Sequence, residues 1–225
     1  MPMNIAIDGP VGAGKSSIAD QVAQRLHILH LDTGAMYRTV ALYMLRNGID
    51  PQDEQTVSAR CGEADVRVAY QDGAQRTMLG GEDVSDLIRT GEVSAAASAI
   101  SKWPAVRRRM VAAQREIAAT ADMLIDGRDI GTRVLIDAPV KIFLTATPEE
   151  RARRRYRQQI EKGDMTPYEQ VLAELNARDA QDMNRETDPL RQAEDAVLVD
   201  STNMTPEQVV EAILAVVEGV YGKRA

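Results

Sequence analysis

Short apolar runs alternate with stretches of helical spacing along the chain. Residues 3–7 form an apolar run with the length of a buried strand, and apolar residues such as Ile18 and Val22 then recur at helical intervals. Alternation of strands and helices favours a parallel sheet that helices cover on both faces. We therefore predict an α/β fold with a five-stranded parallel sheet flanked by helices. Its strands are expected at residues 3–7, 28–31, 123–125, 140–144 and 196–199.

Capping and breaking residues predict where several helices begin and end. A helix is expected over 35–46, between the polar turn at 32–34 and Asn47-Gly48. An Ala-rich helical stretch over 92–119 is interrupted near Trp103-Pro104, because proline disfavours helix in the residue before it. Three further helices are expected to begin with a threonine cap, a following proline and a capping box, and the last should end near Glu218. The three capping threonines are Thr147, Thr166 and Thr205.

Residues 51–90 break this rhythm. Residues 66–70 alternate as in a half-exposed strand, Asp72-Gly73 is typical of a turn, and 77–79 favour a second strand. We interpret the region as a small inserted subdomain that contains a β-hairpin.

Composition excludes several classes of protein. The chain has 225 residues, of which 44% are hydrophobic, so it can bury one substantial core with room for an insertion. A net charge of -7 argues against nucleic acid as a partner, and no apolar run approaches the ~20 residues of a membrane span. One cysteine, Cys61, and no recognisable secretory leader predict a cytoplasmic protein. We interpret His27 and His30 as packing or surface residues, not zinc ligands.

A glycine-rich segment follows the first expected strand. It matches the P-loop pattern G-x-x-x-x-G-K-[ST] at Gly9, Gly14, Lys15 and Ser16. A strand, the loop and a helix follow in the order that a phosphate cradle requires, which argues against a chance glycine-rich turn. Backbone N–H groups and the helix N-terminus attract phosphate there. Lys15 can reach the β- and γ-phosphates of a nucleoside triphosphate, and the Ser16 hydroxyl can hold Mg²⁺.

Polar segments also follow the second and third expected strands. Ligands bind beyond the carboxyl ends of parallel strands, so the segments 9–16, 32–38 and 126–132 should line one cleft. Arg38 and Arg128 would both face that cleft. Two arginines beside a P-loop predict a second anionic group besides the phosphates of the nucleotide; the alternative is two arginines on solvated loops.

Two charged stretches follow the fourth expected strand. Arg178, Asp182 and Arg185 share one face of the helix after Thr166, either as a binding constellation or as solvated ion pairs. Residues 149–157 are rich in arginine and, with residues 162–164, suit a lid that closes over polyphosphate. A nucleic-acid patch or plain exposed charge is the alternative for this second stretch.

Three segments together resemble the bacterial cytidylate kinases. They read Asp8-Gly9-Pro10 with Gly12-Ala13-Gly14-Lys15, Leu31-Asp32-Thr33-Gly34-Ala35-Met36-Tyr37-Arg38, and Asp126-Gly127-Arg128-Asp129-Ile130-Gly131-Thr132. The similarity extends over nearly the whole chain. It implies a P-loop NTPase-type core (about 1–38, 120–147 and 190–225), an NMP-binding subdomain with its insertion (about 39–119), and a helical lid with the following helix (about 148–189). It also implies transfer of the γ-phosphoryl group of ATP to CMP or dCMP, with Mg²⁺.

The resemblance also implies roles for individual residues. The donor phosphates would be bound by Gly9, Pro10, Val11, Gly12, Ala13, Gly14, Lys15, Ser16 and Ser17, with Ser16 as a metal ligand. CMP would be bound by Thr33, Tyr37, Arg38, Ser98, Arg107, Arg128, Asp129, Arg178, Asp182 and Arg185. Catalysis would depend on Lys15, Arg128 and a lid arginine, for which we favour Arg154 over Arg151 and Arg155. Ser16-Ser17 departs from the Gly-Thr of many relatives, but Ser16 keeps the hydroxyl.

Other functions remain open at this stage. The nearest alternative is another P-loop kinase with UMP, AMP or a shikimate-like acceptor. A GTP- or ATP-binding switch is more distant, because no Asn-Lys-x-Asp guanine motif occurs, and a nucleic-acid-stimulated ATPase conflicts with the acidic charge. We expect a monomer whose partners are its small-molecule substrates, with no nucleic acid and no membrane.

Overall fold

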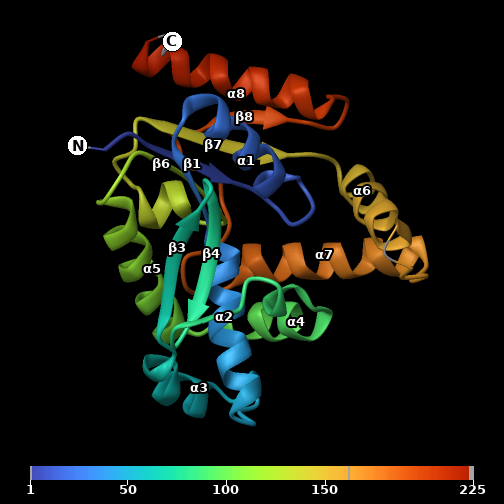
Figure 1. Cartoon of the computed structure of the whole chain (residues 1–225). Helices are drawn as coiled ribbons and strands as arrows, with labels where there is room; N and C mark the ends of the chain where they lie inside the picture. The colour runs from blue at the N-terminus through green and yellow to red at the C-terminus, as the bar shows by residue number, and fades with distance from the viewer. Residues whose placement is uncertain (1, 162, 223–225) are drawn as a thin grey trace.

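A five-stranded sheet with the order β2-β6-β1-β7-β8 forms the centre of the computed structural model, which describes residues 2–161 and 163–222 (Figure 1). Every pair of neighbouring strands in it is parallel, and Ile5 on the central strand lies opposite Leu124 on one side and Val140 on the other. The predicted α/β fold and its parallel sheet are confirmed. The strands are β1 (Asn4–Asp8), β2 (Leu29–Asp32), β6 (Met123–Gly127), β7 (Val140–Thr145) and β8 (Val197–Asp200).

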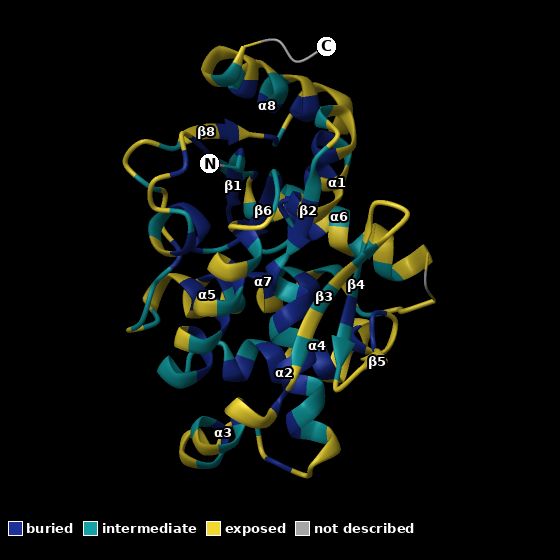
Figure 2. Ribbon diagram, turned by 60° about the vertical axis from the view of Figure 1, so that its left-hand side comes forward, coloured by how far each residue is buried: buried dark blue, intermediate teal, exposed yellow. Residues whose placement is uncertain are grey.

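Helices cover both faces of this sheet, because successive side chains of a strand point to opposite sides. Ile5 and Ile7 join a core beneath α1 (Lys15–Leu26) and α8 (Pro206–Tyr221), whereas Ala6 joins a core beneath the helices of the other face. Figure 2 shows the buried residues along the inner faces of these layers. Both cores are thus built from the same central strand.

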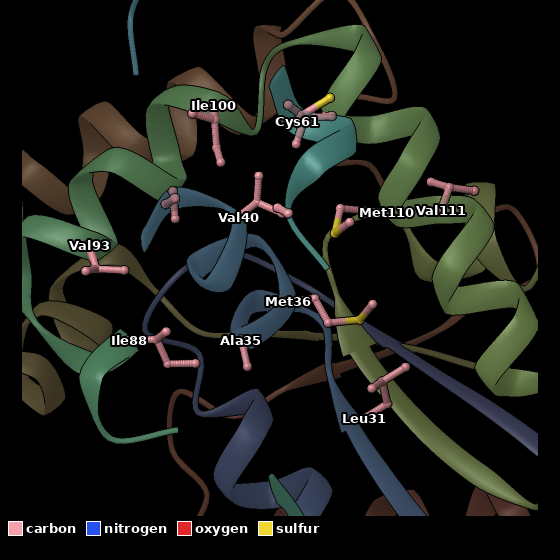
Figure 3. Packing of buried hydrophobic residues seen from close by; sticks show 14 of the residues in the cluster. Leu31, Ala35, Met36, Val40, Cys61, Ile88, Val93, Ile100, Met110 and Val111 are labelled. Carbon is pink, nitrogen blue, oxygen red and sulfur yellow. The ribbon is translucent and has the colours of Figure 1, made fainter. Parts of the chain in front are cut away.

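The second core lies mainly around α2 (Thr33–Arg46). Met36 and Val40 are fully buried on this helix, and Met110 approaches them from α5 (Pro104–Ala118) (Figure 3). α4 (Gly91–Ile100) packs against α2, and Trp103-Pro104 separates α4 from α5 as predicted.

The inserted region forms a three-stranded antiparallel sheet, of which the sequence predicted two strands. β3 (Val66–Gln71) and β4 (Ala74–Leu79) form the expected hairpin, whose turn places Asp72 and Gly73 at φ 51° and 78°. Both angles are left-handed, as a two-residue hairpin turn requires. The sequence analysis missed β5 (Glu82–Asp83), which is too short for a pattern, and α3 (Glu54–Arg60), which Asp53 caps.

Two predicted helix starts are wrong. α2 begins at Thr33, earlier than expected, because the Asp32 side chain accepts from the Ala35 N–H and makes the supposed turn a helix cap. Thr166 does not cap α7 (Tyr168–Asn184), since its hydroxyl donates to Asp164 instead. The capping box at Thr205 is confirmed.

α6 (Pro148–Glu161) and α7 pack against each other beside the sheet (Figure 1). Ala152, Val171 and Leu175 form a small core of their own between them. Lys162, part of the proposed lid, lies outside the described residues, and the division into core, NMP-binding subdomain and lid stays a prediction. No helix within the described residues is long and apolar enough to cross a membrane.

Candidate active site

The P-loop connects β1 to α1 by a backbone that side chains would obstruct. A Cβ atom on Gly9, at φ 152°, would lie 2.0 Å from the Leu144 carbonyl oxygen of β7. Gly14 has the left-handed φ of 86° immediately before α1 begins at Lys15. Glycine is therefore required where the loop passes the next strand, and its polar backbone is left to face a ligand.

Lys15 is buried at the start of α1. Its ammonium donates to the Pro10 carbonyl at 2.8 Å, within the loop itself. The pKa of Lys15 is lowered to about 7, because burial disfavours the charged form and the Arg128 guanidinium lies nearby. A bound polyphosphate would restore the charge, so the site favours an anion next to this ammonium.

Ser16 faces a carboxylate that the sequence analysis did not assign. Its hydroxyl donates to Asp126 Oδ2 at 2.9 Å, at the end of β6. Burial alone would raise the pKa of Asp126, but the hydrogen bond and charge of His30 hold this pKa below its usual value. The sequence did contain a signal for this residue, because Asp126 directly follows the apolar run 123–125 of an expected strand. Ser16 and Asp126 form a pair of oxygen ligands of the type that Mg²⁺ prefers.

Within residues 2–161 and 163–222, no group of three or more His, Cys, Asp and Glu side chains could hold a metal ion by itself. A magnesium ion at Ser16 and Asp126 would thus need most of its ligands from nucleotide phosphates and water, which is its usual coordination in kinases.

Three arginines that the sequence predicted meet on the other side of the P-loop. Arg38 donates to Asp32 Oδ2 at 2.7 Å, and Arg128 Nε donates to Asp182 Oδ2 at 2.9 Å. Arg178 has a buried Nε without a hydrogen-bond partner in the described part of the chain, and so does Arg38.

The charge of this group is unbalanced. The pKa of Arg178 is lowered to about 10, first by burial and then by the positive charge of Arg128; Asp182 opposes the shift and Arg38 adds to it. Partly buried cations in excess of their carboxylates, with buried N–H groups that have no partner among the described residues, favour an anionic ligand.

A second network gathers the residues predicted for the base. Asp129 accepts from Arg107 through one oxygen and from Arg185, at 3.2 Å, through the other. The Arg107 side chain lies 5.9 Å from the centre of the Tyr37 ring and also donates to Asp188. Burial raises the pKa of Tyr37 to about 12. Asp188, which supports this network, was missed because no motif includes it.

Three predicted residues make contacts of other kinds. The Ser98 hydroxyl and carbonyl accept from Gln181. Arg154 donates to the hydroxyl and carbonyl of Ser201 and pairs with Glu150. The Thr33 hydroxyl donates to the Asp126 carbonyl at 2.7 Å. The structure therefore does not bring Arg154 to the P-loop, and its role stays a prediction that requires it to leave Ser201.

Arg151 is the lid arginine that contacts the P-loop. It donates to the Val11 carbonyl at 2.9 Å and to Asp179 Oδ2 at 2.6 Å, while the Val11 N–H donates to Asp179 Oδ1 at 3.2 Å. Helices α6 and α7 thus hold both backbone polar groups of one P-loop residue, Val11. Arg151 was one of the three arginines considered from the sequence, whereas Asp179 was not identified there.

Asp8 joins the P-loop strand to the loop of Arg128. Its two oxygens each accept at 2.7 Å from the N–H groups of Ile130 and Gly131. Burial raises the pKa of Asp8 to about 6 despite these hydrogen bonds. Strand β1 and the loop after β6 are therefore fixed to each other.

His30 does not fit its predicted role as a packing or surface residue. It is buried, and its two ring nitrogens are hydrogen-bonded to the carboxylates of Asp20 and Asp126. The exposed His27 agrees with its prediction.

The parallel sheet, the P-loop and the arginines on neighbouring loops define a P-loop kinase. The model of the cytidylate kinase family matches residues 5–219, and the chain belongs to this family. Curated cytidylate kinases of Caldicellulosiruptor bescii and Mycobacterium avium are 49% and 51% identical to it. The first match covers 94% of each chain, and the second covers 92% of this chain and 91% of the relative.

A solved structure agrees at the level of the fold. A crystal structure of an uncharacterised protein from Eubacterium ventriosum has a TM-score of 0.51 and 12% identity, covering 98% of this chain and 99% of its own. This likeness extends to the fold alone.

Proposed function

We propose that the chain transfers the γ-phosphoryl group of ATP to CMP or dCMP, giving ADP and CDP or dCDP. Family membership over nearly the whole length supports the reaction. The observation in the site that carries it is the group of Arg38, Arg128 and Arg178 beside the P-loop, in which two buried Nε atoms have no hydrogen-bond partner in the part of the chain that the structure describes. A P-loop serves the donor phosphates, so this second cationic group suits the phosphate of an acceptor.

The donor half consists of residues 9–17. Its backbone N–H groups and Lys15 would hold the β- and γ-phosphates. Ser16 and Asp126 would hold Mg²⁺, which supplies positive charge next to the transferring phosphoryl group when bound. The two oxygens lie 2.9 Å apart at the start of α1 and fit this ion.

In the acceptor half, Arg38 and Arg128 would bind the CMP phosphate, since guanidinium groups match phosphate bidentately. Thr33, at the start of α2, would support the loop that carries Arg128, because its hydroxyl donates to the Asp126 carbonyl. Arg178 and Asp182 would meet the ribose, where a carboxylate accepts from hydroxyl groups.

Asp129, Arg107 and Arg185 would recognise cytosine, with Ser98 and the Tyr37 ring beside them. A carboxylate or hydroxyl accepts from the cytosine amino group, and arginine donates to its ring acceptors. Uracil reverses this pattern at positions 3 and 4, and would leave buried polar groups unpaired.

No general base is required for this reaction. The acceptor is a phosphate monoester with a second pKa of about 6, so it is mostly a dianion near neutral pH. Catalysis then depends on position and charge: Lys15 and lid arginines neutralise the transferring group while Arg128 aligns the acceptor. Closure of α6 and α7 would exclude water, which otherwise competes as acceptor.

A panel of acceptors tests this function. With ATP and Mg²⁺, coupled detection of ADP should show turnover with CMP and dCMP and a kcat/KM about 10²-fold or more lower with UMP. AMP and shikimate are included in the panel because they are acceptors of the alternative P-loop kinases considered from the sequence. The Asp129→Asn variant should narrow the ratio between CMP and UMP, and equal kcat/KM for these two in the wild-type protein would overturn the base assignment.

A further inference from the structure

His30 lies between two carboxylates beside the P-loop helix. Its Nδ1 is 2.6 Å from Asp20 Oδ1 and its Nε2 is 2.9 Å from Asp126 Oδ1. Ionised carboxylates only accept hydrogen bonds, so both ring nitrogens must donate and the ring carries a positive charge. Burial opposes that charge, but the two carboxylates outweigh it and raise the pKa of His30 to about 10.

The fold explains why this ring reaches Asp126. His30 is on β2 opposite Leu124 of β6, and side chains two residues apart on a strand share a face. Asp126 therefore projects from the same face as Leu124, which α1 covers. Asp20 is on α1, so the imidazole bridges this helix and the end of β6.

The two oxygens of Asp126 are divided between two partners. Oδ1 accepts from His30, and Oδ2 accepts from the Ser16 hydroxyl at 2.9 Å. Rotation of the carboxylate out of its present plane would weaken both hydrogen bonds. His30 thus helps to fix the orientation in which one carboxylate oxygen faces the P-loop.

We infer that His30 is a positioning residue for magnesium-nucleotide binding: its ring, hydrogen-bonded to both Asp20 and Asp126, holds the Asp126 carboxylate in the orientation in which one of its oxygens faces Ser16. This inference rests on the proposed role of Ser16 and Asp126 at the metal. The residue acts through Asp126 and does not touch the nucleotide. Partners that orient a metal-ligating carboxylate in this way typically change metal affinity 10–100-fold when they are removed.

A purely structural role makes a different prediction. A residue that only fills the space between β2 and α1 could be replaced by an apolar side chain of similar size. Removal of the ring, however, leaves one oxygen of the buried Asp126 carboxylate without its hydrogen bond and frees the carboxylate to turn. The side chain of Asp20 is 61% exposed, whereas that of Asp126 is 5% exposed. Water can therefore hydrogen-bond to Asp20 in place of His30, but it cannot reach Asp126 in the same way.

The experiment measures ATP binding without an acceptor. Calorimetry with the His30→Leu variant, with and without Mg²⁺, gives the gain in ATP affinity that the metal provides. We expect this gain to fall about 10-fold, with Mg²⁺-free binding much less affected. The His30→Gln variant keeps a donor toward Asp126 without the charge and should recover part of the gain. His27→Asn is the matched control on the exposed histidine, where Asn tolerates the φ of 54°.

A wild-type magnesium gain in both His30 variants, while only the melting temperature falls, would overturn the inference. His30→Gln, which keeps a hydrogen-bond donor toward Asp126, decides the matter where His30→Leu does not fold. The panel of acceptors tests the proposed kinase reaction independently, so the two failures can be distinguished.

Discussion

The donor half and the acceptor half of the site are built in different ways. The donor half is one continuous segment, residues 9–17, and most of its polar groups belong to the backbone. The acceptor half takes side chains from α2, α5, the loop after β6, and α7. A backbone cradle recognises phosphate in any nucleotide, whereas an assembly of side chains can recognise one base. We therefore expect substrate choice to depend on the acceptor half, and turnover to depend on both.

The charged side chains of the two halves also differ in what they contact before a substrate is bound. In the donor half, the Lys15 ammonium donates a hydrogen bond to the Pro10 carbonyl of its own loop. The acceptor arginines Arg38, Arg128 and Arg185 are each paired with a carboxylate before any substrate is bound. A nucleotide can displace the carbonyl from Lys15 directly, but CMP must share the arginines with Asp32, Asp182 and Asp129. The acceptor half is thus ordered in advance.

The largest effect is expected in the donor half. Lys15→Met removes the ammonium that would neutralise the transferring phosphoryl group, so kcat should fall about 10³-fold with every acceptor. Coupled ADP detection with CMP and dCMP measures this. Lys102→Met is the matched control, because Lys102 lies over the Trp103 ring and contacts Gln52. A loss confined to one acceptor would contradict the separation of the two halves.

A change at Arg128 should be smaller and selective. Arg128→Ala removes a guanidinium proposed for the CMP phosphate and leaves Asp182 with one partner fewer, so kcat/KM for CMP should fall about 10²-fold. ATP affinity, measured by calorimetry without CMP, should change little. Arg67→Ala is the control, since Arg67 is exposed on β3 and pairs with Asp65. An equal loss in ATP affinity would show that Arg128 serves the donor as well.

The site residues that could be predicted are those that a local pattern in the sequence identifies. The P-loop is a local pattern, and the rule that ligands bind at the ends of parallel strands led from it to Arg38 and Arg128. The i, i+4, i+7 spacing led to Arg178, Asp182 and Arg185 in the same way. All of these lie where a local period or a strand end can identify them.

Those rules placed Asp126 at the end of a strand in the cleft but could not identify its partner, and they did not reach Asp179. Asp126 meets Ser16 across 110 positions of sequence, and Asp179 meets Val11 across 168. Such pairs depend on how strands and helices are placed side by side, which no local pattern specifies. His30 was misjudged for the same reason, because its two carboxylates are on α1 and β6 and not in its own segment.

Local competition explains the error at Thr166. The sequence Thr-Pro-x-Glu is as good a capping signal there as Thr-Pro-x-Gln is at Thr205. Asp164, two residues earlier, accepts from both the N–H and the hydroxyl of Thr166. Aspartate commonly forms such turns, and this one takes the hydroxyl away from the helix.

The smallest effect is expected where the inserted hairpin meets the acceptor half. Gln75 on β4 accepts from the Asp32 N–H at 2.7 Å and donates to the Asp32 carbonyl at 3.3 Å. Asp32 in turn caps α2 and pairs with Arg38. The hairpin therefore holds the residue that orients an acceptor arginine, although none of its described hydrogen bonds joins it to a predicted site residue.

Gln75→Ala should raise KM for CMP about 5-fold, because a hydrogen bond of this kind contributes about 1 kcal/mol net. Neither kcat nor KM for ATP should change appreciably, since the P-loop has no contact with Gln75 among the described hydrogen bonds. Gln71→Ala, at the exposed end of the same hairpin, is the matched control. Steady-state kinetics with each substrate varied in turn decides the matter. A rise in KM for ATP equal to that for CMP would mean that the insertion supports the whole cleft, and the distinction between the two halves would then not extend to the residues behind them.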